Sequence, residues 1–288
     1  MKRNVMMCLL LLVVAEAATA RARAQSISYL LPDRYEVVAG REVAVHLSRG
    51  TSGVLETLPW PGDGIEWFFV RTAGTQRNVA KPGTALPGED SVRLEFDEPD
   101  VAMIGLDCRP RVESVSGALM RKFLESQVAA STLPADWMAQ TSGETLRVRH
   151  VESAKLLVRV ARGVPGNKDE WRGSATAPSK SGQRTEIRPL IDPTAIAVSS
   201  DLPLRISWAD SAGVDVRIVT RQVATGTTQT SLAPGGAGWF TVSAPGEWRV
   251  EVHRAKRLQG DPAADWELET ATLSFLVPAV SKPAGGGK

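Results

Sequence analysis

The residues of this sequence that are best suited to chemistry lie near its C-terminal end. In the segment 247–253 apolar and polar residues alternate, which places Glu251 and His253 on one face of a predicted strand. If the chain returns antiparallel with His253 opposite Asp265, the same register sets Glu251 opposite Glu267. Carboxylates that face each other destabilise a sheet pair, whereas a divalent cation accepts carboxylate oxygens and an imidazole nitrogen. The pattern therefore predicts a metal site formed by Glu251, His253, Asp265 and Glu267.

A second register stays open, because the connection 254–264 is long and does not fix the strand pairing. In that alternative the carboxylates spread over a solvated face, where Arg254, Lys256 and Arg257 neutralise them. The first register predicts a metal site, and the second predicts none.

Enzyme signatures are absent from the sequence. It contains no G-x-S-x-G, H-E-x-x-H, C-x-x-C, P-loop or Rossmann glycine pattern. The three histidines, His46, His150 and His253, are about 100 residues apart, so a site that used two of them would have to be assembled by the fold. We therefore expect a protein that is not an enzyme.

Eight tryptophans against two tyrosines raise the question of a glycan site. Trp67, Trp208 and Trp248 are in phase with apolar neighbours and are predicted to lie in the core. Trp60, which lies between two prolines, and Trp171 fall in predicted loops and are the candidates for exposed tryptophans. If the protein has a glycan site, it is expected there first.

The elements that must position these residues are mainly strands. Alternation or continuous apolar character predicts strands at 42–48, 65–70, 92–96, 101–107 and 155–160 in a first unit, 25–162. One helix interrupts them: Ser116 can cap it, and Leu119, Met120, Phe123, Leu124 and Val128 form its apolar stripe.

The second unit, 185–278, follows a linker or long loop at 163–184 that is rich in Gly, Pro, Ser and Lys. Its short strands, predicted at 204–208, 214–220, 227–232, 238–242, 247–253 and 270–277, are typical of an antiparallel sandwich. The predicted fold is mainly β, with two β-sandwich, immunoglobulin-like units and one helix packed on the first. The tail 279–288 is predicted to be disordered.

The N-terminus has the pattern of a cleaved signal peptide. Lys2 and Arg3 precede an apolar run of about 11 residues, and small residues follow it. We place cleavage after Ala24, or alternatively after Ala20. Removing 1–24 takes 34 basic residues to 30 and 32 acidic residues to 31, so the net charge becomes −1 instead of +2. We expect a periplasmic protein with no membrane span after cleavage and no nucleic-acid partner.

Cleavage would also leave Cys108 as the only cysteine, so no disulfide is expected within the chain. The residue is interpreted as a small, half-buried side chain at the end of a strand. A reactive thiol or an intermolecular disulfide is the alternative.

Several segments resemble a bacterial family of exported proteins of unknown function, commonly labelled as a periplasmic component of cobalt/nickel uptake. They read PGEWRVEVH at 245–253, ADWE at 264–267, ATLSF at 271–275, ESAKLLVRV at 152–160 and GWF at 238–240. The resemblance implies two sandwich-like units, export and a part in metal handling. The sequence departs from the family where similar members carry histidines, reading QSISYLLP at 25–32 and DVAM at 100–103.

Together these features predict a periplasmic, non-catalytic binding or accessory protein that handles nickel or cobalt, with a divalent transition metal as its ligand and an envelope or transport protein as its partner. The alternative is an envelope scaffold or interaction module that binds a protein partner or a glycan.

Overall fold

A computed structural model describes residues 27–51, 54–60, 64–73, 75–80, 90–143, 145–163, 173–211 and 213–279. In chain order its strands are β1 (Ile27–Pro32), β2 (Glu36–Val38), β3 (Glu42–Thr51), β4 (Val54–Leu58), β5 (Ile65–Thr72), β6 (Thr75–Ala80), β7 (Val92–Glu95), β8 (Asp100–Cys108), β9 (Arg111–Ser116), β10 (Thr145–Ala161), β11 (Thr185–Pro189), β12 (Asp201–Trp208), β13 (Val216–Gln222), β14 (Thr228–Ala233), β15 (Ala237–Thr241), β16 (Gly246–Arg257) and β17 (Trp266–Val277). The helices are α2 (Gly117–Gln127) and the short α3 (Trp137–Gln140). Each strand predicted from the sequence overlaps one of these strands.

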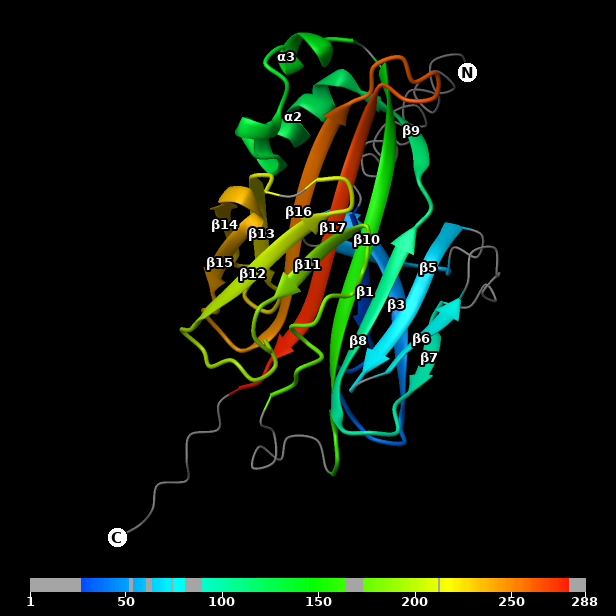
Figure 1. The fold of residues 1–288 in the computed structure, drawn as a ribbon, viewed down its shortest axis with the longest axis vertical. Helices are drawn as coiled ribbons and strands as arrows, with labels where there is room; N and C mark the ends of the chain where they lie inside the picture. Colours follow the sequence, from blue (N-terminus) through cyan, green and yellow to red (C-terminus); the bar gives the residue numbers. More distant parts are fainter. Residues whose placement is uncertain are drawn as a thin grey trace, which may run out of the picture.

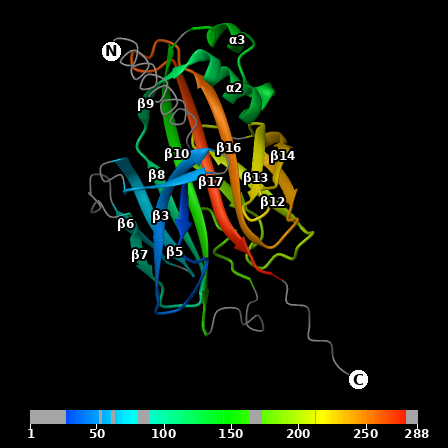
Figure 2. The same ribbon diagram turned by 180° about the vertical axis from the view of Figure 1, so that it is seen from behind.

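The strands form three sheets. The largest, sheet B, has the order β14-β13-β16-β17-β10-β8-β5-β6, and β2 and β9 also pair with β10. Sheet A has the order β1-β3-β4, with β7 paired to β3, and sheet C has the order β11-β12-β15. Sheets A and C lie on opposite faces of sheet B, so that sheet C is in front in Figure 1 and β1 and β3 are in front in Figure 2.

Successive side chains of the strands in sheet B alternate between two hydrophobic cores, one on each face of the sheet. Leu157 and Leu273 point into the core that sheet C covers, and Leu156 and Val158 point into the core that sheet A covers. Because successive side chains of a strand point to opposite faces, one central strand serves two sandwiches. Strand β10 is buried almost continuously from Val151 to Val160 for this reason.

Strand β10 joins the two halves of the molecule. Its first part pairs with β9 antiparallel and with β17 parallel, and its last part pairs with β8 antiparallel and with β2 parallel. It has 17 residues, which corresponds to about 56 Å of extended chain. The two sandwiches therefore share one continuous sheet.

Helix α2 begins where the sequence predicts it. The Ser116 hydroxyl accepts a hydrogen bond from the Leu119 N–H (3.3 Å), and Met120, Phe123 and Leu124 are buried. These side chains pack with Trp266 and neighbouring residues of β9, β10, β16 and β17, so the helix covers one end of sheet B (Figure 1). Among the described residues, no helix has the length and apolar character needed to cross a membrane.

The structure confirms the predicted fold class, which is mainly β with two sandwiches of the immunoglobulin-like type and one main helix. Residues 173–184 run as irregular chain, with Ala177 and Gln183 buried. The predicted signal peptide 1–24, Trp171 and residues 280–288 of the predicted tail lie outside the described residues.

Candidate functional site

The register of the β16–β17 hairpin differs from the one that the predicted metal site requires. His253 stands opposite Thr270 and Glu251 opposite Thr272, instead of Asp265 and Glu267. The hairpin is longer than predicted: it continues to the pair Arg257–Trp266. The shift is five residues, and an odd shift moves the acidic residues to the other face.

Packing explains this register. In the observed pairing the Trp266 side chain is fully buried in the cluster that helix α2 covers. In the predicted pairing Trp266 would stand opposite Val252, whose side chain belongs to the core that sheet C covers. The indole would then point to the other face of the sheet and leave the cluster under α2. The apolar area of a tryptophan is large enough to decide between two registers that have similar backbone hydrogen bonds.

Glu251 and His253 remain neighbours, but the face that carries them is buried rather than solvated. Glu251 is 6% and His253 is 2% exposed. Strand β1 covers this face: the Tyr29 hydroxyl donates to Glu251, and the Thr272 hydroxyl donates to the Ser28 carbonyl (2.8 Å). The prediction of an outer face was wrong because β1, more than 200 residues away in sequence, was not recognised as a strand.

The Thr270 hydroxyl, the His253 imidazole and the Glu251 carboxylate form a row on this buried face. His253 Nδ1 is 3.0 Å from Thr270 Oγ1, and His253 Nε2 is 3.7 Å from the nearer Glu251 oxygen. The edge of the imidazole meets the Phe123 ring, with centroids 5.1 Å apart. These are the group types of a nucleophile, a base and an orienting acid, but all three side chains are buried, so substrate has no access to them.

The other two predicted ligands have separate partners. Asp265 accepts from the Arg147 guanidinium (3.0 Å) and from the Arg147 backbone N–H (2.8 Å). Glu267 lies 3.4 Å from the Lys256 ammonium and 3.6 Å from the Arg149 guanidinium. Within the described part of the chain, no group of three or more His, Cys, Asp or Glu side chains could hold a metal ion. The four residues predicted as ligands therefore do not meet.

The remaining groups of chemical interest have structural surroundings. His150 is buried near Glu113 (3.7 Å), and His46 Nδ1 is 3.0 Å from the Asp90 carbonyl. Cys108 is half-buried at the end of β8, where burial, followed by the nearby Glu152, raises the thiol pKa to about 12. Raising the thiol pKa lowers the fraction of reactive thiolate at neutral pH, which favours the structural interpretation of Cys108 over the reactive thiol.

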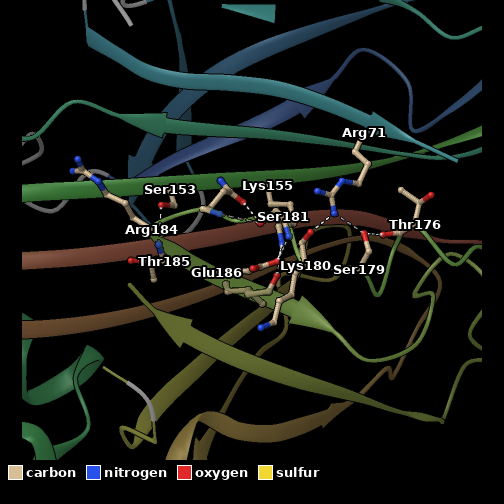
Figure 3. Close-up of polar contacts among 12 residues, drawn as sticks. Arg71, Ser153, Lys155, Thr176, Ser179, Lys180, Ser181, Arg184, Thr185 and Glu186 are labelled. Atoms are coloured by element: carbon tan, nitrogen blue, oxygen red, sulfur yellow. Dashed lines mark hydrogen bonds and ion pairs between the residues drawn. The ribbon is translucent and has the colours of Figure 1, made fainter. Parts of the chain in front are cut away.

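A buried ion pair connects β10 with β11. The Lys155 ammonium donates to the Glu186 carboxylate (2.8 Å) and to the Ile187 carbonyl (3.0 Å), and the Ser181 N–H donates to the same carboxylate oxygen (2.6 Å). Figure 3 shows these groups converging between the two strands. Burial lowers the pKa of Lys155, and the charge of Glu186 opposes that shift. The polar atoms satisfy one another, so the pair holds the two sheets together and offers no vacant ligand position.

A cleft of about 540 Å³ lies beside the β5–β6 hairpin and residues 173–179. Its one basic side chain, Arg71, donates to Gln76 (2.9 Å) and to the Ser179 hydroxyl (3.2 Å), as Figure 3 shows for Ser179. Those bonds occupy the guanidinium within the protein, so the cleft is a weak candidate for a charged ligand.

The exposed tryptophan of the described residues lies on a strand, not in a loop as predicted. Trp60 is buried, with its ring centroid 4.9 Å from that of Phe68, so the expectation that it is exposed was wrong. Trp208 and Trp248 are buried as predicted, and Trp67 packs at the edge of the same core. The strongly exposed indole is Trp239 on β15, at 62%.

Trp239 lies on the outer face of sheet C. Its neighbours on β15, Gly238 and Phe240, point inward, and a Cβ on Gly238 would come within 2.7 Å of Ala233. The strand therefore approaches the core closely on one side and presents the indole on the other. The alternation of residues 238–240 was the sequence signal that could have placed Trp239 on the outer face. A tryptophan next to a phenylalanine favours the opposite interpretation, a core position.

The outer face of sheet C arranges its side chains in three cross-strand rows. We define the Trp239 face as these rows. In the middle row Pro203 stands opposite Trp239, and the Leu190 N–H donates to the Pro203 carbonyl. Leu190 is also exposed, at 45%. The first flanking row is Arg188, Arg205 and Ala237, and the second is Asp201 and Thr241.

The charges on the Trp239 face are not balanced. Arg188 and Arg205 stand directly opposite each other, and neither has a carboxylate partner among the described residues. Asp201 accepts from the Thr241 hydroxyl (2.7 Å), and Glu186 is engaged with Lys155. The face thus presents an open indole between a doubly cationic row and a small polar row.

The chain matches no family model and no curated protein sequence. Among solved structures it is similar to a two-domain fibronectin type III segment of chicken tenascin, at 9% identity over 87% of this chain and 97% of that one, with a TM-score of 0.21. It is also similar to murine CEACAM1b, at 10% identity over 88% of this chain and 100% of that one, with a TM-score of 0.21. A third similarity is to carbohydrate-binding modules from the β-sandwich superfamily, at 8% identity over 88% of this chain and 93% of that one, with a TM-score of 0.22. Similarity at this level carries no functional argument, and the class of the fold rests on its sheets.

Proposed function

We propose that this protein is a non-catalytic binding protein of the bacterial periplasm and that the Trp239 face is its ligand-binding surface. The observation that carries the proposal is the exposed indole of Trp239, framed by a second exposed apolar side chain and by two arginines without acidic partners. Single exposed apolar residues are ordinary on protein surfaces, but an apolar row between polar rows has the composition of a binding site.

The chemistry of these residues supports binding. Tryptophan and arginine are the side chains that most often contribute large binding energies, because they combine apolar area with directed hydrogen bonds. Hydrogen-bonded strands carry these side chains, so the backbone positions of the rows are set before a ligand binds.

The surroundings of β15 favour ligand binding at the face of sheet C over binding at its edge. The carbonyls of Thr241 and Trp239 accept from the side chains of Gln229 and Ser231 on β14, at 3.2 and 3.3 Å. These bonds protect the edge of β15 from pairing with another strand, so a ligand would contact the side chains of the face.

Export and the absence of catalysis complete the proposal. The basic and apolar N-terminal pattern supports export, and the burial of His253 and Thr270 supports a non-enzymatic role. Nickel or cobalt handling, implied by the family resemblance, stays a proposal that has no ligand set among the described residues.

Site-specific photo-crosslinking in the source bacterium tests the proposal. A photoreactive residue is placed at position 239 and, as a matched control, at position 138, where Met138 is 58% exposed and lies away from sheet C. We expect a discrete adduct from position 239 only, located outside the cytoplasm. Absence of any adduct from position 239, or equal adducts from both positions, would refute the assignment of the face.

A further inference from the structure

The arrangement of charge on the Trp239 face indicates the chemistry of its ligand. Like charges directly opposite each other destabilise a sheet pair. Arg188 and Arg205 are opposed in register, and among the described residues no carboxylate lies within ion-pair distance of either guanidinium. A bound anion would relieve this repulsion and would accept from both guanidinium groups. A carboxylate matches the planar fork of arginine.

We propose that the Trp239 face binds a carboxylate-bearing oligosaccharide, with the indole of Trp239 under a sugar ring and Arg188 and Arg205 on the carboxylate. This inference rests on the proposed function, because it names the ligand class of the same face. The apolar indole suits the C–H face of a sugar ring. Asp201 and Thr241, in the row beyond the indole, supply acceptor oxygens for sugar hydroxyls, because the Thr241 hydroxyl already donates to Asp201.

The size of the face favours a glycan over a folded protein. Its three strands span about 10 Å across, and its three rows, four residues apart from first to last, span about 14 Å along the strands. That rectangle, measured between backbone positions, covers on the order of 140 Å². Even with the side chains that stand on it, the three rows are a small part of the roughly 800 Å² of accessible surface that each partner of a stable protein interface buries. An extended peptide that adds to the sheet is disfavoured because side chains of β14 occupy the edge of β15.

The geometry separates the roles of the residues. Arg205 and Trp239 are diagonal neighbours across the β12–β15 pair, a spacing within reach of long and aromatic side chains. One uronate residue can therefore contact both the indole and a guanidinium. Loss of the indole should weaken every saccharide, whereas loss of the arginines should remove only the preference for acidic ones.

Calorimetric titration of the exported form of the protein tests this inference. The probes are oligosaccharides of galacturonate and of glucuronate, with their methyl esters as neutral counterparts of the same shape. We expect an acid to bind roughly tenfold or more tightly than its ester at low salt, and we expect this preference to shrink as salt is added. Trp239→Ala should lose both ligands, and an Arg188→Gln/Arg205→Gln variant should bind acid and ester equally.

Two control variants separate the face from the rest of the surface. Met138→Ala removes another exposed apolar side chain, and Arg93→Gln removes another exposed cation; both should keep the wild-type preference. Equal affinity for acid and ester, a preference that survives loss of both arginines, or no binding to either acid series would overturn the inference. If those results came with a protein adduct from position 239, the proposed binding function would stand and only the glycan assignment would fail.

Discussion

The ion pair between Lys155 and Glu186 allows a quantitative test of what holds the two sheets together. Both side chains are almost completely buried, at 1% and 4% exposure, with 2.8 Å between ammonium and carboxylate. Removing one partner of a buried pair leaves the other charge without compensation and typically destabilises a protein by about 3–5 kcal/mol. The relevant perturbation is Glu186→Gln, which keeps the shape of the side chain.

The size of the expected loss in stability depends on the hydrogen bonds that glutamine keeps at position 186. Its amide oxygen can still accept from the Lys155 ammonium and from the Ser181 N–H, so part of the charge-assisted hydrogen bonding survives. We therefore expect a loss at the lower end of the range, about 3 kcal/mol. A Lys155→Met/Glu186→Leu double variant leaves no buried charge, so it should be more stable than Glu186→Gln. It should stay below the wild type because the Ser181 N–H and the Ile187 carbonyl lose their partners.

Urea unfolding followed by tryptophan fluorescence measures this difference, with a circular-dichroism transition as the check on two-state behaviour. Glu42→Gln is the matched control, because it breaks the exposed pair between Glu42 and Arg93 (3.3 Å), which is expected to contribute no more than about 1 kcal/mol. The reasoning is refuted if Glu186→Gln destabilises the protein no more than the control does, or if the double variant is less stable than Glu186→Gln alone.

Three further predictions concern pH, the helix and metal ions. Burial raises the pKa of the Asp107 carboxyl from 3.8 to about 6. Between these two values the folded protein keeps a proton that the unfolded chain releases. The contribution of Asp107 to the free energy of unfolding should therefore fall by up to about 3 kcal/mol as pH rises from 4 through 6. Asp107→Asn should remove that component from urea titrations across this range, and parallel wild-type and variant profiles would contradict it. Ser116→Ala removes the cap of α2 and should lower the free energy of unfolding by about 1 kcal/mol, whereas an unchanged urea midpoint would show that the cap contributes nothing. Nickel, cobalt, zinc or copper should not selectively raise the melting temperature of chelator-treated protein, because only Glu251 and His253 of the predicted ligands are neighbours; a selective rise that is lost in His253→Gln would show the opposite.

Local pattern was sufficient for much of the fold. Alternation placed Val43, Val45 and Leu47 correctly in the core, and the capping signal at Ser116 located the start of α2. These features depend on residues within one turn or one strand, where side-chain direction follows from backbone geometry alone. The mainly β class and the strand positions follow from the same physics.

The binding face and the hairpin register could not be obtained in this way. The register of β16 and β17 depends on the burial of Trp266 under α2, which is more than 130 residues away in sequence. Glu251 is covered by Tyr29 of β1 and His253 by Phe123 of α2. A strand has two faces, and alternation alone cannot show which of them is buried. Trp60 is buried for the same kind of reason, through Phe68 and its surroundings.

The positions of the strands and of the main helix can be predicted from local pattern, because neighbours in the chain set the direction of each side chain. Which face of a strand meets solvent follows from tertiary packing, because it depends on the distant sheet that covers the strand. Strand β1 of sheet A covers the face that carries Glu251, whereas the outer face of sheet C stays open. That difference places the candidate site on Trp239, Arg188 and Arg205 instead of on Glu251 and His253.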